Sequence, residues 1–176
     1  NSGNVLVAGG TDALRTAFTR EHIALTKAPS APLAAALEAV RGVTRTSTSA
    51  QAQAAAQTIR AQLPSLSNEQ RGALLQDLYT QDRLYLTPRG DSQVRLPLAD
   101  VARELLLSVD DDRQRLMSGP LMHLGVDVLR NDPTATAQAT ALLDATLDGL
   151  DGRRLGWMLT SFGGPLTKHE AGQPVV

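Results

Sequence analysis

The chain contains no cysteine, and this absence limits what can hold its fold together. Disulfide bonds, cysteine-ligated zinc and covalent thioester chemistry all require a thiol, so these residues can supply none of the three. Only five of the 176 residues are Trp, Tyr or Phe. The core must therefore be packed from leucine, alanine and valine, and the length suits a single domain.

Segments in which apolar residues recur at helical spacing are separated by prolines and short polar stretches. Ser67 with Gln70 three residues later resembles a capping box, and Leu74, Leu75 and Leu78 behind it form one apolar face. The helices that we expect run over residues 11–26, 32–41, 50–62, 67–79, 99–107, 110–117, 121–130, 133–147 and 153–161.

One segment departs from the helical pattern. Leu84, Leu86, Val94 and Leu96 alternate with other side chains around a loop that contains Pro88 and Gly90. This alternation is typical of a β-hairpin. The sequence thus predicts a mostly α fold, an irregular multi-helix domain with one short β-hairpin near residues 83–97.

The domain organisation that follows has three parts, and no repeat of constant period appears. Residues 1–10 should form an N-terminal arm that leads into a helix capped by Thr11 or Asp12. Residues 11–164 should form the helical domain, and residues 165–176, which have little apolar content, a flexible tail.

Charge and hydropathy exclude several partners. A net charge of -1 and a pI near 6.3 give no electrostatic reason to expect a nucleic acid or an anionic membrane. No apolar run approaches the roughly 18 residues of a membrane span, and no signal peptide pattern opens the chain. We therefore expect neither a nucleic-acid nor a membrane partner.

Motifs for cofactors, metals and nucleophiles are weak. Gly9-Gly10 follows an apolar run, but Asp12 stands where a dinucleotide-binding turn needs its next glycine, so a nucleotide-binding enzyme is a distant alternative. The three histidines, His22, His123 and His169, lack the spacing of a zinc site. Neither Gly-x-Ser-x-Gly nor Ser-x-x-Lys is present. We expect no cofactor and no metal.

The most unusual segment is Ser118-Gly119-Pro120-Leu121-Met122-His123-Leu124-Gly125. One interpretation is a tight corner between two helices, with His123 partly buried and Gly125 at a packing contact. The other is a protruding apolar knob, in which Leu121 and Leu124 flank His123 and dock in a partner's groove. Local sequence leaves both open.

The His123-Leu124-Gly125 segment, the missing cysteines, the helical composition rich in alanine and arginine, and the length together resemble the C-terminal domain of the XopL family. These are type III secreted effectors of plant-pathogenic xanthomonads, in which a leucine-rich-repeat region precedes a helical E3 ubiquitin-ligase domain. The resemblance covers essentially the whole chain, which contains nothing similar to a leucine-rich repeat.

The resemblance implies an E3 ubiquitin ligase that is delivered by a type III system into the host plant cell. It would bind a charged ubiquitin-conjugating enzyme (E2) and promote transfer of ubiquitin to a host protein substrate by positioning, without a thioester of its own and without zinc. The implied contact with the conjugating enzyme is His123, Leu124 and Gly125, with Leu121 and Pro120 beside them. The residues imply no catalytic nucleophile.

A second class of function fits the composition equally well, namely a helical protein-interaction (adaptor) module without enzymatic activity. The basic residues bear on the choice, because only Lys27 and Lys168 among 17 are lysines. A GC-rich genome would favour arginine in this way. A protein that handles ubiquitin would also gain by offering few acceptor amines of its own.

Overall fold

The computed structural model describes residues 2–44, 46–80 and 92–150, and the side chains of residues 12–44, 46–79 and 92–150. All regular structure in these ranges is helical, so the predicted mostly α fold is confirmed. The elements are α1 (Ser2–Lys27), α2 (Ala31–Gly42), α3 (Ser49–Gln62), η1 (Leu63–Ser65), α4 (Asn68–Thr80), α5 (Ser92–Ser108), α6 (Asp111–Asn131), η2 (Pro133–Ala135) and α7 (Thr136–Asp148).

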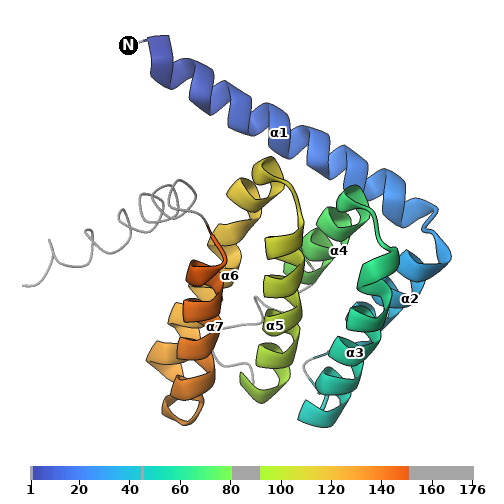
Figure 1. Cartoon of the computed structure of the whole chain (residues 1–176), viewed down its shortest axis with the longest axis vertical. Helices are drawn as coiled ribbons and strands as arrows, with labels where there is room; N and C mark the ends of the chain where they lie inside the picture. Colours follow the sequence, from blue (N-terminus) through green and yellow to red (C-terminus); the bar gives the residue numbers. More distant parts are fainter. Residues whose placement is uncertain (1, 45, 81–91, 151–176) are drawn as a thin grey trace, which may run out of the picture.

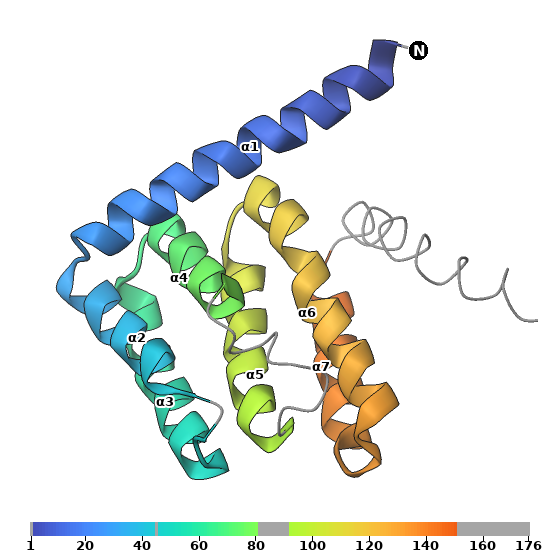
Figure 2. The ribbon, with the colours of Figure 1, turned by 180° about the vertical axis from the view of Figure 1, so that it is seen from behind.

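Helix α1 lies across one end of the remaining helices, which stand side by side beneath it (Figures 1 and 2). Helix α5 occupies the centre and packs against α3, α4, α6 and α7. It is buried on nearly all sides, since leucine, valine and alanine face inward on every turn from Val94 to Leu106. A helix that is apolar all round belongs inside a bundle.

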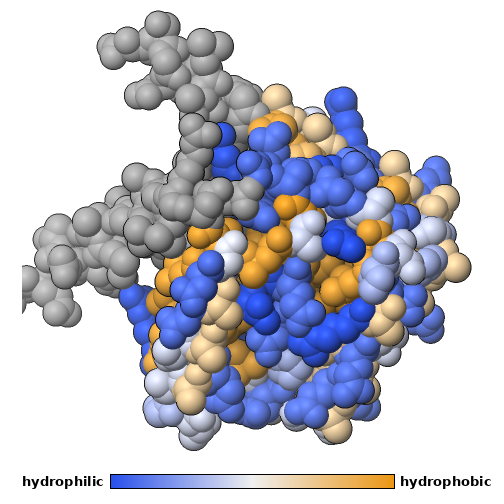
Figure 3. Space-filling view, viewed as in Figure 1, coloured by the Kyte–Doolittle hydropathy of each residue, from blue (hydrophilic) through white to orange (hydrophobic). Residues whose placement is uncertain are grey.

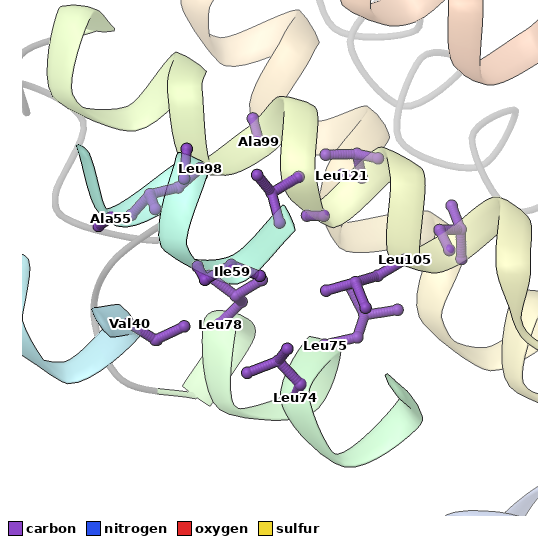
Figure 4. Packing of buried hydrophobic residues seen from close by; sticks show 14 of the residues in the cluster. Val40, Ala55, Ile59, Leu74, Leu75, Leu78, Leu98, Ala99, Leu105 and Leu121 are labelled. Atoms are coloured by element: carbon purple, nitrogen blue, oxygen red, sulfur yellow. The ribbon is translucent and has the colours of Figure 1, made fainter. Parts of the chain in front are cut away.

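The core forms around α5, with leucines from every side meeting its apolar turns. Leu98, Ala99 and Leu105 of α5 belong to one core cluster with Leu75 of α4 and Leu121 of α6, and all five are labelled in Figure 4. None of these five side chains is more than 1% exposed. The expectation of a core made from leucine and alanine is confirmed in the described part of the chain.

Local capping signals decide where two of the helices begin. The Ser67 hydroxyl accepts from the Gln70 N–H at 3.2 Å, and the Gln70 amide oxygen accepts from the Ser67 N–H at 2.9 Å, so the predicted capping box opens α4. Asp110 accepts from the Arg113 N–H at 2.9 Å at the start of α6. These starts follow from side chains three residues apart.

The predicted β-hairpin is wrong for its second strand. Residues 92–97 form the first turns of α5, and residues 81–91 lie outside the described range. Val94 and Leu96 alternate because this part of α5 is buried on several sides, and Val94 also starts a helical series that continues through Leu98 and Val101. A short apolar run does not distinguish a strand from a buried helix.

The predicted start of the first helix is also wrong. Residues 2–10, expected to be an arm, are already helical and continue into the rest of α1. No strand and glycine turn form at Gly9-Gly10, which is the arrangement that a dinucleotide site would need. The tail expected at residues 165–176 and the helix at 153–161 lie outside the described residues.

The two helices expected at 110–117 and 121–130 are one continuous helix, α6, with Pro120 inside it. Proline cannot donate to the carbonyl four residues before it, and it crowds the residue that precedes it. Here that residue is Gly119, which has no Cβ to clash with the proline ring. The Gly-Pro pair is therefore accommodated within the helix and does not turn the chain.

Helix α1 is attached to the bundle by the apolar packing of Phe18 and by polar contacts around a buried arginine. The Arg113 guanidinium binds both carboxylate oxygens of Glu21 at 2.5 and 2.7 Å and also pairs with Asp110. It lies over the Phe18 ring, 4.5 Å from the centroid, as in a cation-π contact. Gly72 of α4 leaves room for this side chain, because a Cβ there would lie 2.7 Å from the Arg113 Cδ.

We predict that Gly72→Ala lowers the free energy of unfolding by about 1 kcal/mol. Alanine favours a helix by about 1 kcal/mol over glycine, but displacing a packed side chain costs about 1–3 kcal/mol. Arg113 has little freedom to move, because Glu21, Asp110 and Phe18 hold it. Urea denaturation followed by circular dichroism measures the difference.

Gly42→Ala is the matched control, since a Cβ at Gly42 meets nothing within 4 Å. It should not destabilise the protein. If Gly72→Ala proves as stable as wild type, Arg113 is not confined in the way that its contacts indicate.

Candidate functional site

Helix α6 presents the predicted site residues on two different sides. Leu121 and Leu124 point into the core and are 1% and 5% exposed, whereas His123 is exposed and Pro120 is half-buried. The fifth residue, Gly125, is buried against α7. The structure therefore brings Pro120 and His123 together on an outer face and assigns the other three to internal packing.

Gly125 allows α6 and α7 to approach closely. A Cβ at this position would lie 2.5 Å from the Leu143 Cδ2 and 2.7 Å from its Cγ, closer than carbon atoms can pack. This agrees with the interpretation of Gly125 as a packing contact. His123 is more exposed than that interpretation expected.

The alternative interpretation, a protruding apolar knob, is wrong for Leu121 and Leu124. Both side chains belong to the main apolar core of the domain. Helical spacing explains their burial, since residues 117, 121, 124 and 128 recur at the intervals that put them on one face. If this segment binds a conjugating enzyme, the exposed side of the helix must make the contact.

That exposed side, which we call the α6 outer face, consists of Pro120, His123, Val126 and Arg130. The residues are three or four apart, so they follow one line along the helix. His123 and Arg130 are exposed, and Pro120 and Val126 are half-buried. The face offers a ring, a guanidinium and two small apolar surfaces, a mixture suited to a protein partner and lacking a nucleophile.

We predict that Leu124→Ala and His123→Ala differ sharply in their effect on stability. Truncating the buried leucine should cost about 2–4 kcal/mol, and truncating the exposed histidine less than about 0.5 kcal/mol. Chemical denaturation of both variants checks this. Similar losses of unfolding free energy in the two variants would contradict the assignment of Leu124 to the buried side of α6 and of His123 to its exposed side.

Asp77 on α4 is a buried carboxylate with partners on two other helices. Arg41 of α2 donates to it from NH2 and Nε at 3.2 and 3.4 Å, and the His22 Nε2 of α1 lies 3.4 Å away. The histidine contact is looser than a well-formed hydrogen bond. Burial alone would raise the pKa of Asp77, but the hydrogen bonds from His22 and Arg41, together with the charge of Arg41, outweigh burial and lower it.

The pKa of Asp100 on α5 is shifted in the opposite direction from that of Asp77. The Asp100 carboxylate is half-buried, and burial raises its pKa above the ordinary value, although the charges of Arg103 and Arg60 act in the other direction. No hydrogen bond or ion pair reaches it from any residue in the described ranges. A half-buried carboxyl group whose pKa is shifted by burial is a candidate for a binding site.

We predict that Asp77→Asn destabilises the protein at pH 7, whereas Asp100→Asn stabilises it. Asp77 has a lowered folded pKa, so its contribution is complete above the unfolded value of about 4 and is lost as the pH falls through the folded value. Asp100 has a raised folded pKa, so its ionised form costs stability at pH 7 and the cost fades as the pH falls toward about 4. Urea midpoints at pH 7 and near pH 3 measure both.

The exposed Asp144 on α7 supplies the control, and Asp144→Asn should leave the midpoint unchanged at either pH. The two variants should move in opposite directions at pH 7 and approach wild type in acid. A shift of both in the same direction would contradict the assignment of their environments.

The sequence alone did not identify Asp77, Asp100 or Arg113 as special. Their helical segments were partly predicted, but partners 36 to 92 residues away determine the environment of Asp77 and Arg113. The available signal was a charged residue inside an apolar stripe, as at Asp77 between Leu74, Leu75 and Leu78. Such a residue needs a partner from another element.

Within the described ranges, no cluster of three or more His, Asp or Glu side chains could hold a metal ion. None of the described helices is long and apolar enough to cross a membrane. Comparisons with protein-family models, with curated proteins and with solved structures gave no match to this chain.

Proposed function

We propose that the chain is an E3 ubiquitin-ligase domain of the XopL type, acting inside a host plant cell after type III secretion. It binds a charged ubiquitin-conjugating enzyme and promotes transfer of ubiquitin to a host protein, without a thioester intermediate and without zinc. The proposal rests on the resemblance at His123-Leu124-Gly125, and the single structural observation that supports it is the exposure of His123 on the α6 outer face.

The mechanism open to such a domain is positioning. With no cysteine in the chain, the reactive thioester must belong to the conjugating enzyme, and the ligase must supply surface. A docked domain favours attack by an acceptor amine when it holds the donor ubiquitin in one orientation. Helix α6 suits this role because it is held rigidly on its other side, where Leu121 and Leu124 pack in the core.

The test is ubiquitin-chain synthesis with His123→Glu in the presence of an activating enzyme, a panel of conjugating enzymes, ubiquitin and ATP. We expect the rate to fall by about tenfold or more, since a carboxylate would disturb a desolvated contact. Thr140→Glu on the exposed side of α7 is the matched control and should keep full activity. Circular dichroism should give both variants the helicity of wild type.

The choice of readout and the choice of variant both decide whether the assay is informative. Free chains should be scored in preference to self-modification, because the chain offers only Lys27 and Lys168 as acceptor lysines. Substitutions of Leu124 or Gly125 should not be used, since either would disturb the core and lose activity through unfolding. Full activity in His123→Glu would refute the proposed contact.

The rival function is a non-enzymatic helical adaptor, and one observation favours it. Most of the segment that carries the resemblance is used for internal packing, so its sequence is explained without any partner. If the wild-type chain promotes no ubiquitin-chain synthesis with any conjugating enzyme of a broad panel, that result would favour the adaptor over the ligase.

A further inference from the structure

A hollow of about 330 Å³ lies between α3, α5 and α7, on the opposite side of α5 from the α4 leucines. Two matched lines of side chains border it: Gln53, Gln57 and Arg60 on α3, and Gln93 and Asp100 on α5, with Gln138 of α7 at one end. The two helices run in the same direction here (Figure 1), so their turns face each other in step. The size falls at the lower end of the range for ligand sites, about 300–1,000 Å³.

The lining of this hollow, which we call the glutamine cavity, is mostly polar, and its apolar part consists of Ala56, Leu96 and Pro97. Leu96 is 7% exposed, and Pro97 is half-buried. The face formed by α3, α5 and α7 is seen in Figure 3, where hydrophilic side chains surround smaller apolar patches. Most small-molecule sites are lined mainly by apolar side chains, so this mostly polar lining suits a polar ligand better.

No described residue forms a hydrogen bond or an ion pair with Asp100 of this cavity, although the charges of Arg103 and Arg60 act on it. Arg60 lies on the opposite wall, and its Nε donates to Glu104 at 2.8 Å, one turn beyond Asp100. This hydrogen bond directs the Nε of Arg60 to Glu104 and not to Asp100. A ligand cation is the chemistry that would complete the site at Asp100.

The glutamines indicate what should accompany that cation. Each carboxamide carries one acceptor oxygen and an NH2 donor, the same complement as a peptide group. Gln53 and Gln57 on one wall are exposed and lie on successive turns, about 5 Å apart along the helix axis. An extended peptide main chain presents donors and acceptors along such a line, whereas a small inorganic ion does not.

We propose that the glutamine cavity binds an extended peptide segment of a partner protein, with an arginine or lysine side chain of that segment directed to Asp100. The site is separate from the α6 outer face, and the inference does not depend on ubiquitin-ligase activity. It assigns a basic peptide as the recognised chemistry.

The test is a titration of the whole ¹⁵N-labelled chain with the blocked peptide acetyl-Gly-Arg-Gly-amide, followed by NMR. Chemical shifts of Gln57, Gln93 and Asp100 should move together. The matched peptide carries citrulline in place of arginine, which keeps the shape and removes the charge. We expect the citrulline peptide to bind about tenfold more weakly, because it loses the charge-assisted contact.

Asp100→Asn should bring the two peptides to the same weak affinity, while Asp144→Asn should preserve the difference between them. Free arginine amide, tested alone, separates recognition of the cation from recognition of the peptide, and it should bind more weakly than the blocked peptide. Since Asp100→Asn is expected to fold at least as stably as wild type, loss of binding would not reflect unfolding.

Three results would overturn the proposal. These are equal affinity for the arginine and citrulline peptides, shifts confined to residues outside the cavity, and absence of binding at millimolar peptide. Because none of these measurements involves ubiquitin, failure here leaves the proposed ligase activity untouched, and failure of the ligase assay leaves the peptide site untouched.

Discussion

The burial of α5 is the constraint on which the rest of the structure depends. No disulfide and no cysteine-bound zinc can hold this chain together, so its helices must be arranged around a shared apolar element. Helix α5 supplies that element, with Leu98, Val101 and Leu105 fully buried among four neighbours. The positions of the α6 outer face and the glutamine cavity follow, since both lie on surfaces of helices that pack against α5.

Sequence reasoning succeeded where structure is decided locally. The capping box at Ser67 and Gln70 depends on atoms within three residues, and it was visible in the pattern. The same reasoning failed where a helix is buried on several sides, because its apolar residues then do not show the spacing of an amphipathic helix. Residues 92–97 look alternating because α5 is surrounded, and Pro120 looks like a break because the accommodating effect of Gly119 is subtle.

The candidate site shows the same division between local and distant information. A short motif can name His123, Leu124 and Gly125, but only the packing of α6 on α7 shows that one faces solvent and two face inward. Asp100 went unnoticed because nothing near it in sequence distinguishes it from Asp144. Its character comes from its burial between packed helices, which the sequence around it does not show.

The attachment of α1 has a consequence for how the domain can be dissected. A cut in the segment around Pro29 would look harmless, because it removes a helix at one end of the bundle and leaves the other described helices in contact. It would also remove Phe18 from the core and take away Glu21 and His22, the partners of Arg113 and Asp77. The loss of apolar packing together with these pairs is costly, so the smallest independently folding unit should include the part of α1 from Phe18 to Lys27.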